Sequence, residues 1–203
     1  MASVAVKPTR WAWTFVVALV VALAATASPA QAWQPESASY GVGEQSNVGV
    51  TMKDGTVLRA NVYYPTDTTT GKAAAGPFPV ILTQTPYGKD NAVFSGLGAG
   101  YSAYLVQRGY INVVADVRGT GASEGEWGLF DPVQGTDGAT LVNWAAGLPH
   151  SDGKVGLFGA SYLGIDQFAT AVDAGPSHVK AMFPIISGND LYRDTSFAGG
   201  FQD

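Results

Sequence analysis

The sequence predicts an α/β fold with a mainly parallel sheet and helices on both faces. After two strand-like segments, short apolar runs rich in β-branched residues alternate with segments of helical spacing. Parallel strands need such crossover connections, so this alternation favours a parallel sheet. The 203 residues are 46% hydrophobic and 13% charged, which is enough apolar matter for one sizeable core and excludes a disordered chain.

The first 32 residues have the features of a secretory signal peptide. Lys7 and Arg10 precede an apolar stretch, and Ala30 and Ala32 supply the small residues of a cleavage site. A membrane anchor is the alternative, but the apolar run is about 15 residues, short of the ~20 that span a bilayer. We therefore expect cleavage after Ala32, a secreted protein without a stable membrane anchor, and one folded domain over residues 33–203.

Composition excludes several classes of function. The net charge is -5 and the pI is about 4.8, so no basic face is expected to bind nucleic acid. The chain has no cysteine, which excludes disulfides, thiolate metal sites and a cysteine nucleophile. Its two histidines do not cluster in sequence, so we expect neither a metal site nor a cofactor.

The chain begins, after the leader, with a predicted β-hairpin. Residues 46–52 and 57–64 alternate like strands and flank Asp54-Gly55, which is a hairpin turn signal. We expect this antiparallel pair to lie at an edge of the sheet. The following brief apolar run, 80–83, predicts the next strand.

The remaining elements alternate between helix and strand. Residues 98–108 have helical spacing, and Gly109 stands at the expected end of that helix. Residues 111–115 form a continuous β-branched run, typical of a strand covered on both faces. A helix is expected over 137–146, and one more buried strand over 179–186.

A strand, a sharp turn and a helix are predicted around Ser161. The apolar run 155–158 meets Gly159-Ala160-Ser161-Tyr162-Leu163-Gly164, and helical spacing follows over 165–172. A serine on such a turn is strained, so small residues are needed where strand and helix approach. The nucleophile-elbow signature has glycine two residues after the serine, where Leu163 stands instead. Ligands bind at the carboxyl ends of parallel strands, which makes Ser161 a candidate nucleophile.

Attack by a serine requires a base and donors for the oxyanion. The backbone N–H of Tyr162 is expected to be one donor. In hydrolases of this topology the second comes from the loop after the third strand, and that loop carries Tyr87, whose hydroxyl could donate. The alternative is that Tyr87 is an ordinary packed loop tyrosine.

Residues 40–193 resemble the cocaine esterase and X-Pro dipeptidyl-peptidase group of α/β-hydrolases (CocE/NonD, peptidase S15-like). The motifs that carry the resemblance are Lys53-Asp54-Gly55 with Tyr63-Tyr64-Pro65, Thr85-Pro86-Tyr87-Gly88-Lys89, residues 116–125, and residues 151–164. In this group the nucleophile elbow has the sequence Gly-x-Ser-Tyr-x-Gly. This motif accounts for Leu163 at the position where the general signature has glycine, and for Gly164 after it. The resemblance implies an α/β-hydrolase fold, Ser161 as nucleophile, and the Tyr87 hydroxyl and Tyr162 N–H as oxyanion hole. It also implies a serine hydrolase whose substrates are small esters, amides or short peptides, Xaa-Pro peptides included.

The loop after the predicted strand at 111–115 contains three polar residues that look like substrate-binding groups, namely Asp116, Arg118 and Ser123. We expect Arg118 to be structural, paired with a carboxylate such as Asp116 or Glu124, because long charged side chains are rarely fixed without partners. Trp127, in the same loop, is a candidate wall of the substrate pocket.

The base that Ser161 needs is missing from the predicted site. In this fold the order is serine, then acid, then histidine. The helix between Ser161 and His178 would be about 18 Å long and would carry the chain to the opposite side of the sheet. His150 precedes the strand that leads to Ser161, so both histidines are expected in surface loops.

The resemblance implies that a cap, two strands, the acid and the histidine would follow Asp203. We therefore expect the amino-terminal part of a hydrolase, incomplete at its carboxyl end and inactive as it stands. The alternative is a complete, non-catalytic binding or remnant domain.

Overall fold

The structure is a computed structural model that describes residues 34–91, 100–188, 190 and 192–197. The chain divides into two compact units, Met1–Glu36 and Ser37–Asp203. The expected signal peptide lies outside the described residues, and residues 34–36 have no regular secondary structure. The larger unit contains the helices and strands described below.

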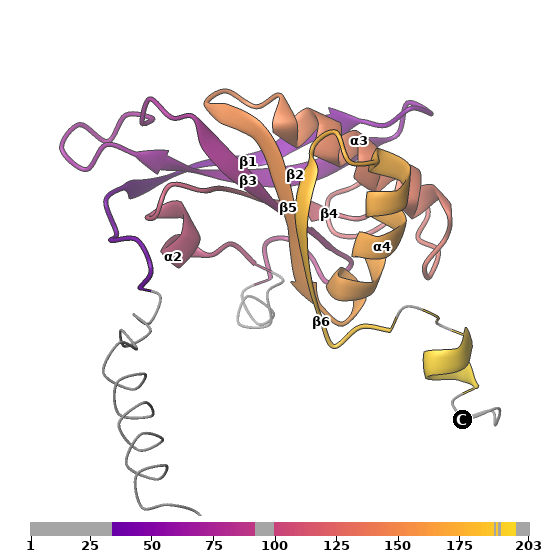
Figure 1. Cartoon of the computed structure of the whole chain (residues 1–203). Helices are drawn as coiled ribbons and strands as arrows, with labels where there is room; N and C mark the ends of the chain where they lie inside the picture. The colour runs from indigo at the N-terminus through magenta and orange to yellow at the C-terminus, as the bar shows by residue number, and fades with distance from the viewer. Residues whose placement is uncertain (1–33, 92–99, 189, 191, 198–203) are drawn as a thin grey trace, which may run out of the picture. The chain divides into compact units, whose positions relative to one another are not determined.

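The larger unit is built on a six-stranded sheet with the order β1-β2-β4-β3-β5-β6 (Figure 1). Its strands are β1 (Gly41–Thr51), β2 (Val57–Thr66), β3 (Phe78–Thr85), β4 (Ile111–Asp116), β5 (Ser151–Ala160) and β6 (Val179–Ile185). Strand β2 runs antiparallel to β1 and β4, whereas β4, β3, β5 and β6 are mutually parallel neighbours. The predicted mainly parallel sheet is therefore confirmed.

The predicted hairpin forms one edge of this sheet. Strands β1 and β2 pair along most of their length, and Gly55 adopts φ 89° in the turn between them. Only glycine takes this conformation without strain. The antiparallel edge pair is confirmed, although β1 starts earlier than residue 46.

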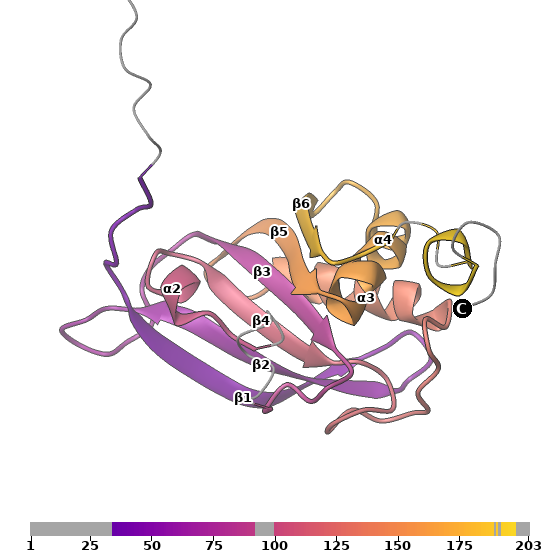
Figure 2. The same cartoon turned by 90° about the horizontal axis from the view of Figure 1, so that it is seen from below.

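Helices cover both faces of the sheet, as predicted. Helices α3 (Val133–Ala146) and α4 (Tyr162–Ala174) lie together on one face, and the short α2 (Ala103–Val106) lies on the other (Figure 2). Strand β4 shows why both faces are apolar, because Val113 belongs to the main core while Val114 packs with Val106 of α2. No helix in the described part of the chain is long and apolar enough to cross a membrane.

Two predictions about these elements are wrong in detail. The described helix α2 is much shorter than 98–108, although Gly109 follows it with φ 85°. Strand β6 was expected to be buried, but the side chain of Phe183 is 62% exposed. The reason is position: in the described part of the chain β6 is the edge strand opposite β1 and pairs only with β5.

Candidate active site

Ser161 stands where β5 ends and α4 begins, at the carboxyl end of a central strand. Its backbone has φ 58° and ψ −124°, a conformation that costs a non-glycine residue energy and is held only by the surrounding structure. Three hydrogen bonds hold it: the Ser161 N–H donates to the carbonyl of Ile185 at 2.8 Å, and its own carbonyl accepts from the N–H groups of Gly164 at 2.8 Å and Ile165 at 3.0 Å. The predicted strand, sharp turn and helix are thus present.

The two glycines of the turn are required by close backbone approach. A Cβ atom on Gly164 would lie 2.9 Å from the carbonyl oxygen of Ile185, and one on Gly159 would overlap the side chain of Leu163. Neither neighbour is a flexible side-chain end that could move aside. Small residues are therefore required at these two positions, as the sequence predicts.

Tyr162, the first residue of α4, presents its backbone N–H at the Ser161 turn. The first N–H groups of a helix have no acceptor within the helix, so this donor is available by position. The phenol of Tyr162 points away into the protein, donates to Oε1 of Gln134 at 2.5 Å, and stacks on Phe130 at 4.5 Å between ring centroids. Burial raises the pKa of Tyr162, and its hydrogen bonds with Trp127 and Gln134 oppose that rise.

Tyr87 lies next to this turn, on the loop that follows β3. Its ring meets the ring of Tyr162 edge to face, with 6.4 Å between centroids, and its side chain is 38% exposed. Asp116, at the end of β4, holds this loop in place, because its carboxylate accepts from the Lys89 N–H at 2.5 Å. The same carboxylate accepts from the Ala122 N–H at 2.9 Å. The structure thus places Tyr87 against Tyr162, which directly follows Ser161, so the three residues predicted to act in catalysis lie at one end of the sheet.

An apolar cavity of about 440 Å³ opens beside Tyr87 and Tyr162. Its lining includes Tyr87, Tyr162, Thr120, Trp127 and Leu129. Trp127 is therefore in the pocket wall, as the sequence suggested. Such a volume is in the range of small-molecule sites, which are mostly apolar with a few placed polar groups.

Arg118 is structural, but its predicted partners are wrong. Its guanidinium forms a two-pronged pair with Asp137, with both N···O distances 2.8 Å, and a third contact of 2.7 Å with Asp54. These bonds raise the pKa of Arg118 and hold the pKa of Asp54 below its usual range. Asp116 and Glu124 have other roles, because each binds backbone N–H groups. Sequence proximity suggested the wrong carboxylates.

Neither of the chain's two histidines lies at the Ser161 end of the sheet. The His178 ring contacts the carbonyl of Gly153 at 2.9 Å, near the start of β5. Ser161 follows the other end of that strand, eight residues on, or roughly 26 Å at ~3.3 Å per residue. His150 contacts the carbonyl of Ala75 at 3.0 Å, also before β5. The predicted separation of both histidines from Ser161 is confirmed.

Gln134 was missed by sequence reasoning. It is 6% exposed, and its two amide atoms bind different segments: Oε1 accepts from Tyr162, and Nε2 donates to the carbonyl of Gly128 at 2.6 Å. It thereby ties the turn at Ser161 to the loop that carries Trp127. A glutamine in the first turn of a helix gives no sequence signal for such a role.

The described residues contain no group of three side chains suited to hold a metal ion. The arrangement at this end of the sheet instead combines a hydroxyl on a strained turn, two possible donors and an apolar cavity. This combination is suited to acyl transfer.

Comparison with known proteins places the chain among hydrolases. Residues 54–203 match the model of the X-Pro dipeptidyl-peptidase (S15 family). The chain is 37% identical over 155 residues to the cocaine esterase of Rhodococcus sp. (strain MB1 Bresler), a match that covers 76% of this chain and 25% of the relative. The chain thus spans about a quarter of the length of that relative.

Solved structures support the same relationship. A CocE/NonD family hydrolase from Staphylococcus aureus superimposes with a TM-score of 0.67 at 26% identity, covering 88% of this chain and 35% of that one. An alpha-amino acid ester hydrolase superimposes with a TM-score of 0.61 at 25% identity, covering 87% of this chain and 30% of that one. The sheet and helices described above are therefore those of an α/β-hydrolase, in part, and the chain belongs to the X-Pro dipeptidyl-peptidase (S15) family.

Proposed function

We propose that the protein is a secreted serine hydrolase that cleaves ester or amide bonds, Xaa-Pro peptide bonds among the candidates, through an acyl-enzyme. Ser161 is its nucleophile, and the Tyr87 hydroxyl and the Tyr162 N–H stabilise the oxyanion. The backbone of Ser161 carries this proposal, because a non-glycine residue with a strained φ of 58° between a parallel strand and a helix has the conformation of a nucleophile elbow.

The neighbours of Ser161 support the assigned roles. Tyr162 N–H comes directly after the serine, at the amino end of α4, where the helix dipole favours developing negative charge. Tyr87 stands across the same cavity as Tyr162. In the proposed reaction the Ser161 oxygen bonds to the substrate carbonyl carbon, and a base accepts the serine proton. The alcohol or amine then leaves with a proton, and water releases the acyl group.

We place that base, with its acid, in coding sequence beyond Asp203. Both histidines of the 203 residues lie at the far end of β5, so the 203 residues alone are expected to turn over esters weakly or not at all. If the 203 residues act on their own, the alternative applies to them, namely a non-catalytic remnant domain. Secretion forms part of the proposal and is supported by the basic and apolar pattern of residues 1–32.

The test is hydrolysis of an aryl ester by the protein read through beyond Asp203. We expect Ser161→Ala to abolish turnover while the matched control Ser39→Ala, at an exposed serine, leaves it unchanged. Continued hydrolysis by Ser161→Ala would contradict the assignment. A downstream coding sequence without an acid and a histidine would favour the remnant instead.

A further inference from the structure

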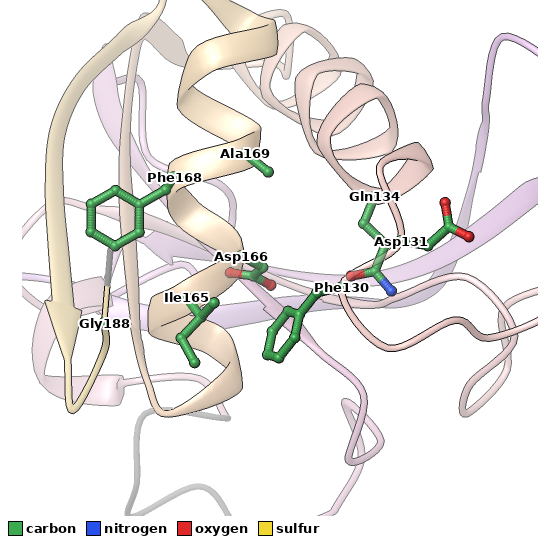
Figure 3. A pocket seen from close by; sticks show the side chains of 8 residues that line it. All are labelled: Phe130, Asp131, Gln134, Ile165, Asp166, Phe168, Ala169 and Gly188. Atoms are coloured by element: carbon green, nitrogen blue, oxygen red, sulfur yellow. The ribbon is translucent and has the colours of Figure 1, made fainter. Parts of the chain in front are cut away.

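A second pocket lies next to the Ser161 turn, on the helical side of the sheet. It has a volume of about 200 Å³ and is formed between α4 and the segment that leads into α3 (Figure 3). Ile165, Asp166 and Phe168 come from α4, and Phe130 and Gln134 come from the other side. None of these residues lines the apolar cavity that holds Tyr87 and Trp127.

Asp166 is the unusual member of this lining. Asp166 is only 6% exposed, and both of its carboxyl oxygens are buried without a hydrogen-bond partner. Burial raises the pKa of Asp166 well above its usual value of 3.8. A buried carboxyl group without a donor is costly, so its presence in a pocket indicates a ligand that supplies the donor.

The surroundings of Asp166 favour a positive charge. Figure 3 shows the ring of Phe130 on the same side of α4 as the Asp166 carboxyl group, and the ring of Phe168 on the other side of the helix. The faces of aromatic rings attract cations. The described lining contains no lysine, arginine or histidine, and the carboxyl group of Asp131 points away from Asp166 in Figure 3. Hydrogen bonds between a cation and a carboxylate are about twice as strong as those between neutral groups.

The geometry also limits the form of the cation. An ammonium group carries three N–H donors, which match the two oxygens of Asp166 and the second lone pair on Oε1 of Gln134. That oxygen already accepts from the Tyr162 phenol. A volume of about 200 Å³ admits the ammonium group and a short carbon chain, whose apolar partners would be Ile165 and Phe168.

We propose that this pocket binds a small primary ammonium ion, with the carboxylate of Asp166 as its counterion. A bound cation stabilises the charged form of this carboxylate in place of solvent. The site requires no chemistry at Ser161, so it stands or falls independently of the proposed hydrolase function.

The test is a calorimetric titration of the protein with n-butylammonium and, as the uncharged match, with 1-butanol. We expect n-butylammonium to bind at least tenfold more tightly than 1-butanol. The backbone amides whose NMR chemical shifts change on binding should be those of residues 130–134 and 165–169. Absence of n-butylammonium binding, or equal affinity for 1-butanol, would overturn the proposal.

Variants locate the counterion. Asp166→Asn should weaken n-butylammonium binding by tenfold or more, because the amide keeps the shape and removes the charge. Asp131→Asn is the matched control and should change affinity less than threefold, because Asp131 is exposed and already accepts from the Val133 N–H. Unchanged affinity in Asp166→Asn would contradict the assignment. If that variant does not fold, Asp166→Thr and the comparison with 1-butanol in the unmodified protein decide the question.

Discussion

The phenol of Tyr162 donates a hydrogen bond to Oε1 of Gln134 at 2.5 Å, across 28 residues of sequence. Because Tyr162 directly follows Ser161, this bond couples the candidate nucleophile to the first turn of α3. Gln134 passes the coupling on to Gly128, in the loop of Trp127. The position of the turn is therefore set partly by a side chain that takes no part in the proposed chemistry.

Replacing both partners of this bond should cost less than the sum of replacing each partner alone. Gln134→Leu leaves a buried hydroxyl without its acceptor and should lower the free energy of unfolding by about 1–3 kcal/mol. Adding Tyr162→Phe removes the unsatisfied group, so the double variant should lose less than the sum of the single variants. Urea denaturation of the four proteins measures this coupling, and strictly additive losses would show that the bond is unimportant.

The turn at Ser161 should tolerate no side chain at Gly164. A Cβ atom there would meet the backbone oxygen of Ile185 at 2.9 Å, so Gly164→Ala should lower the free energy of unfolding by about 1–3 kcal/mol. Gly147→Ala is the matched control, since the nearest atom to its Cβ would be 3.6 Å away, and surface changes of this kind stay within about 0.5 kcal/mol. Thermal unfolding of both variants makes the comparison. Equal effects would mean that the turn can relax.

The pair between Arg118 and Asp54 should make stability depend on pH in the acid range. The Arg118 hydrogen bond holds the pKa of Asp54 below its usual value of 3.8, so folding favours the ionised carboxylate. Its contribution is fully present above pH 3.8 or so and is lost as the pH falls through the lower folded-state pKa. The difference in Tm between the unmodified protein and Asp54→Asn should therefore shrink towards pH 2. Because the pair is exposed, salt should also reduce the difference. A difference that stays constant from pH 7 to pH 2 would contradict this account.

The hydroxyl of Tyr87 should act on turnover more than on substrate binding. In the protein read through beyond Asp203, Tyr87→Phe keeps the ring that lines the cavity and removes the proposed oxyanion donor. Loss of one such donor typically lowers kcat by about 10²- to 10³-fold. Steady-state kinetics on an aryl ester should show this fall in kcat with a smaller change in KM. Tyr104→Phe, on α2, is the control and should leave both constants unchanged. If Tyr87→Phe also left both constants unchanged, Tyr87 would be an ordinary loop tyrosine and not an oxyanion donor.

Local patterns in the sequence predicted much of this fold. Strand β4 follows almost residue for residue from the β-branched run at 111–115, since such runs suit a strand buried on both faces. The turn at Gly55 and the glycines beside Ser161 were also readable, because each answers a local requirement of the backbone.

Long-range contacts were not readable in the same way. Arg118 pairs with Asp54, which is 64 residues away in sequence, whereas local reasoning favoured Asp116 and Glu124. Gln134 and Asp166 are buried polar residues on helices, and nothing in the residues beside them indicates what they contact. The exposure of Phe183 depends on which strand lies at the sheet edge, which is a property of the whole sheet.

Mapping the adduct of a fluorophosphonate by mass spectrometry tests the central claim most directly. In the protein read through beyond Asp203, we predict one rapidly modified residue, Ser161, and no such modification in Ser161→Ala. In the 203 residues alone, both histidines lie near the start of β5, at the end of the strand opposite Ser161. Labelling of Ser161 should therefore be slow. Rapid modification of a different serine in the longer protein, or an unmodified Ser161 in a protein that hydrolyses esters, would contradict the account.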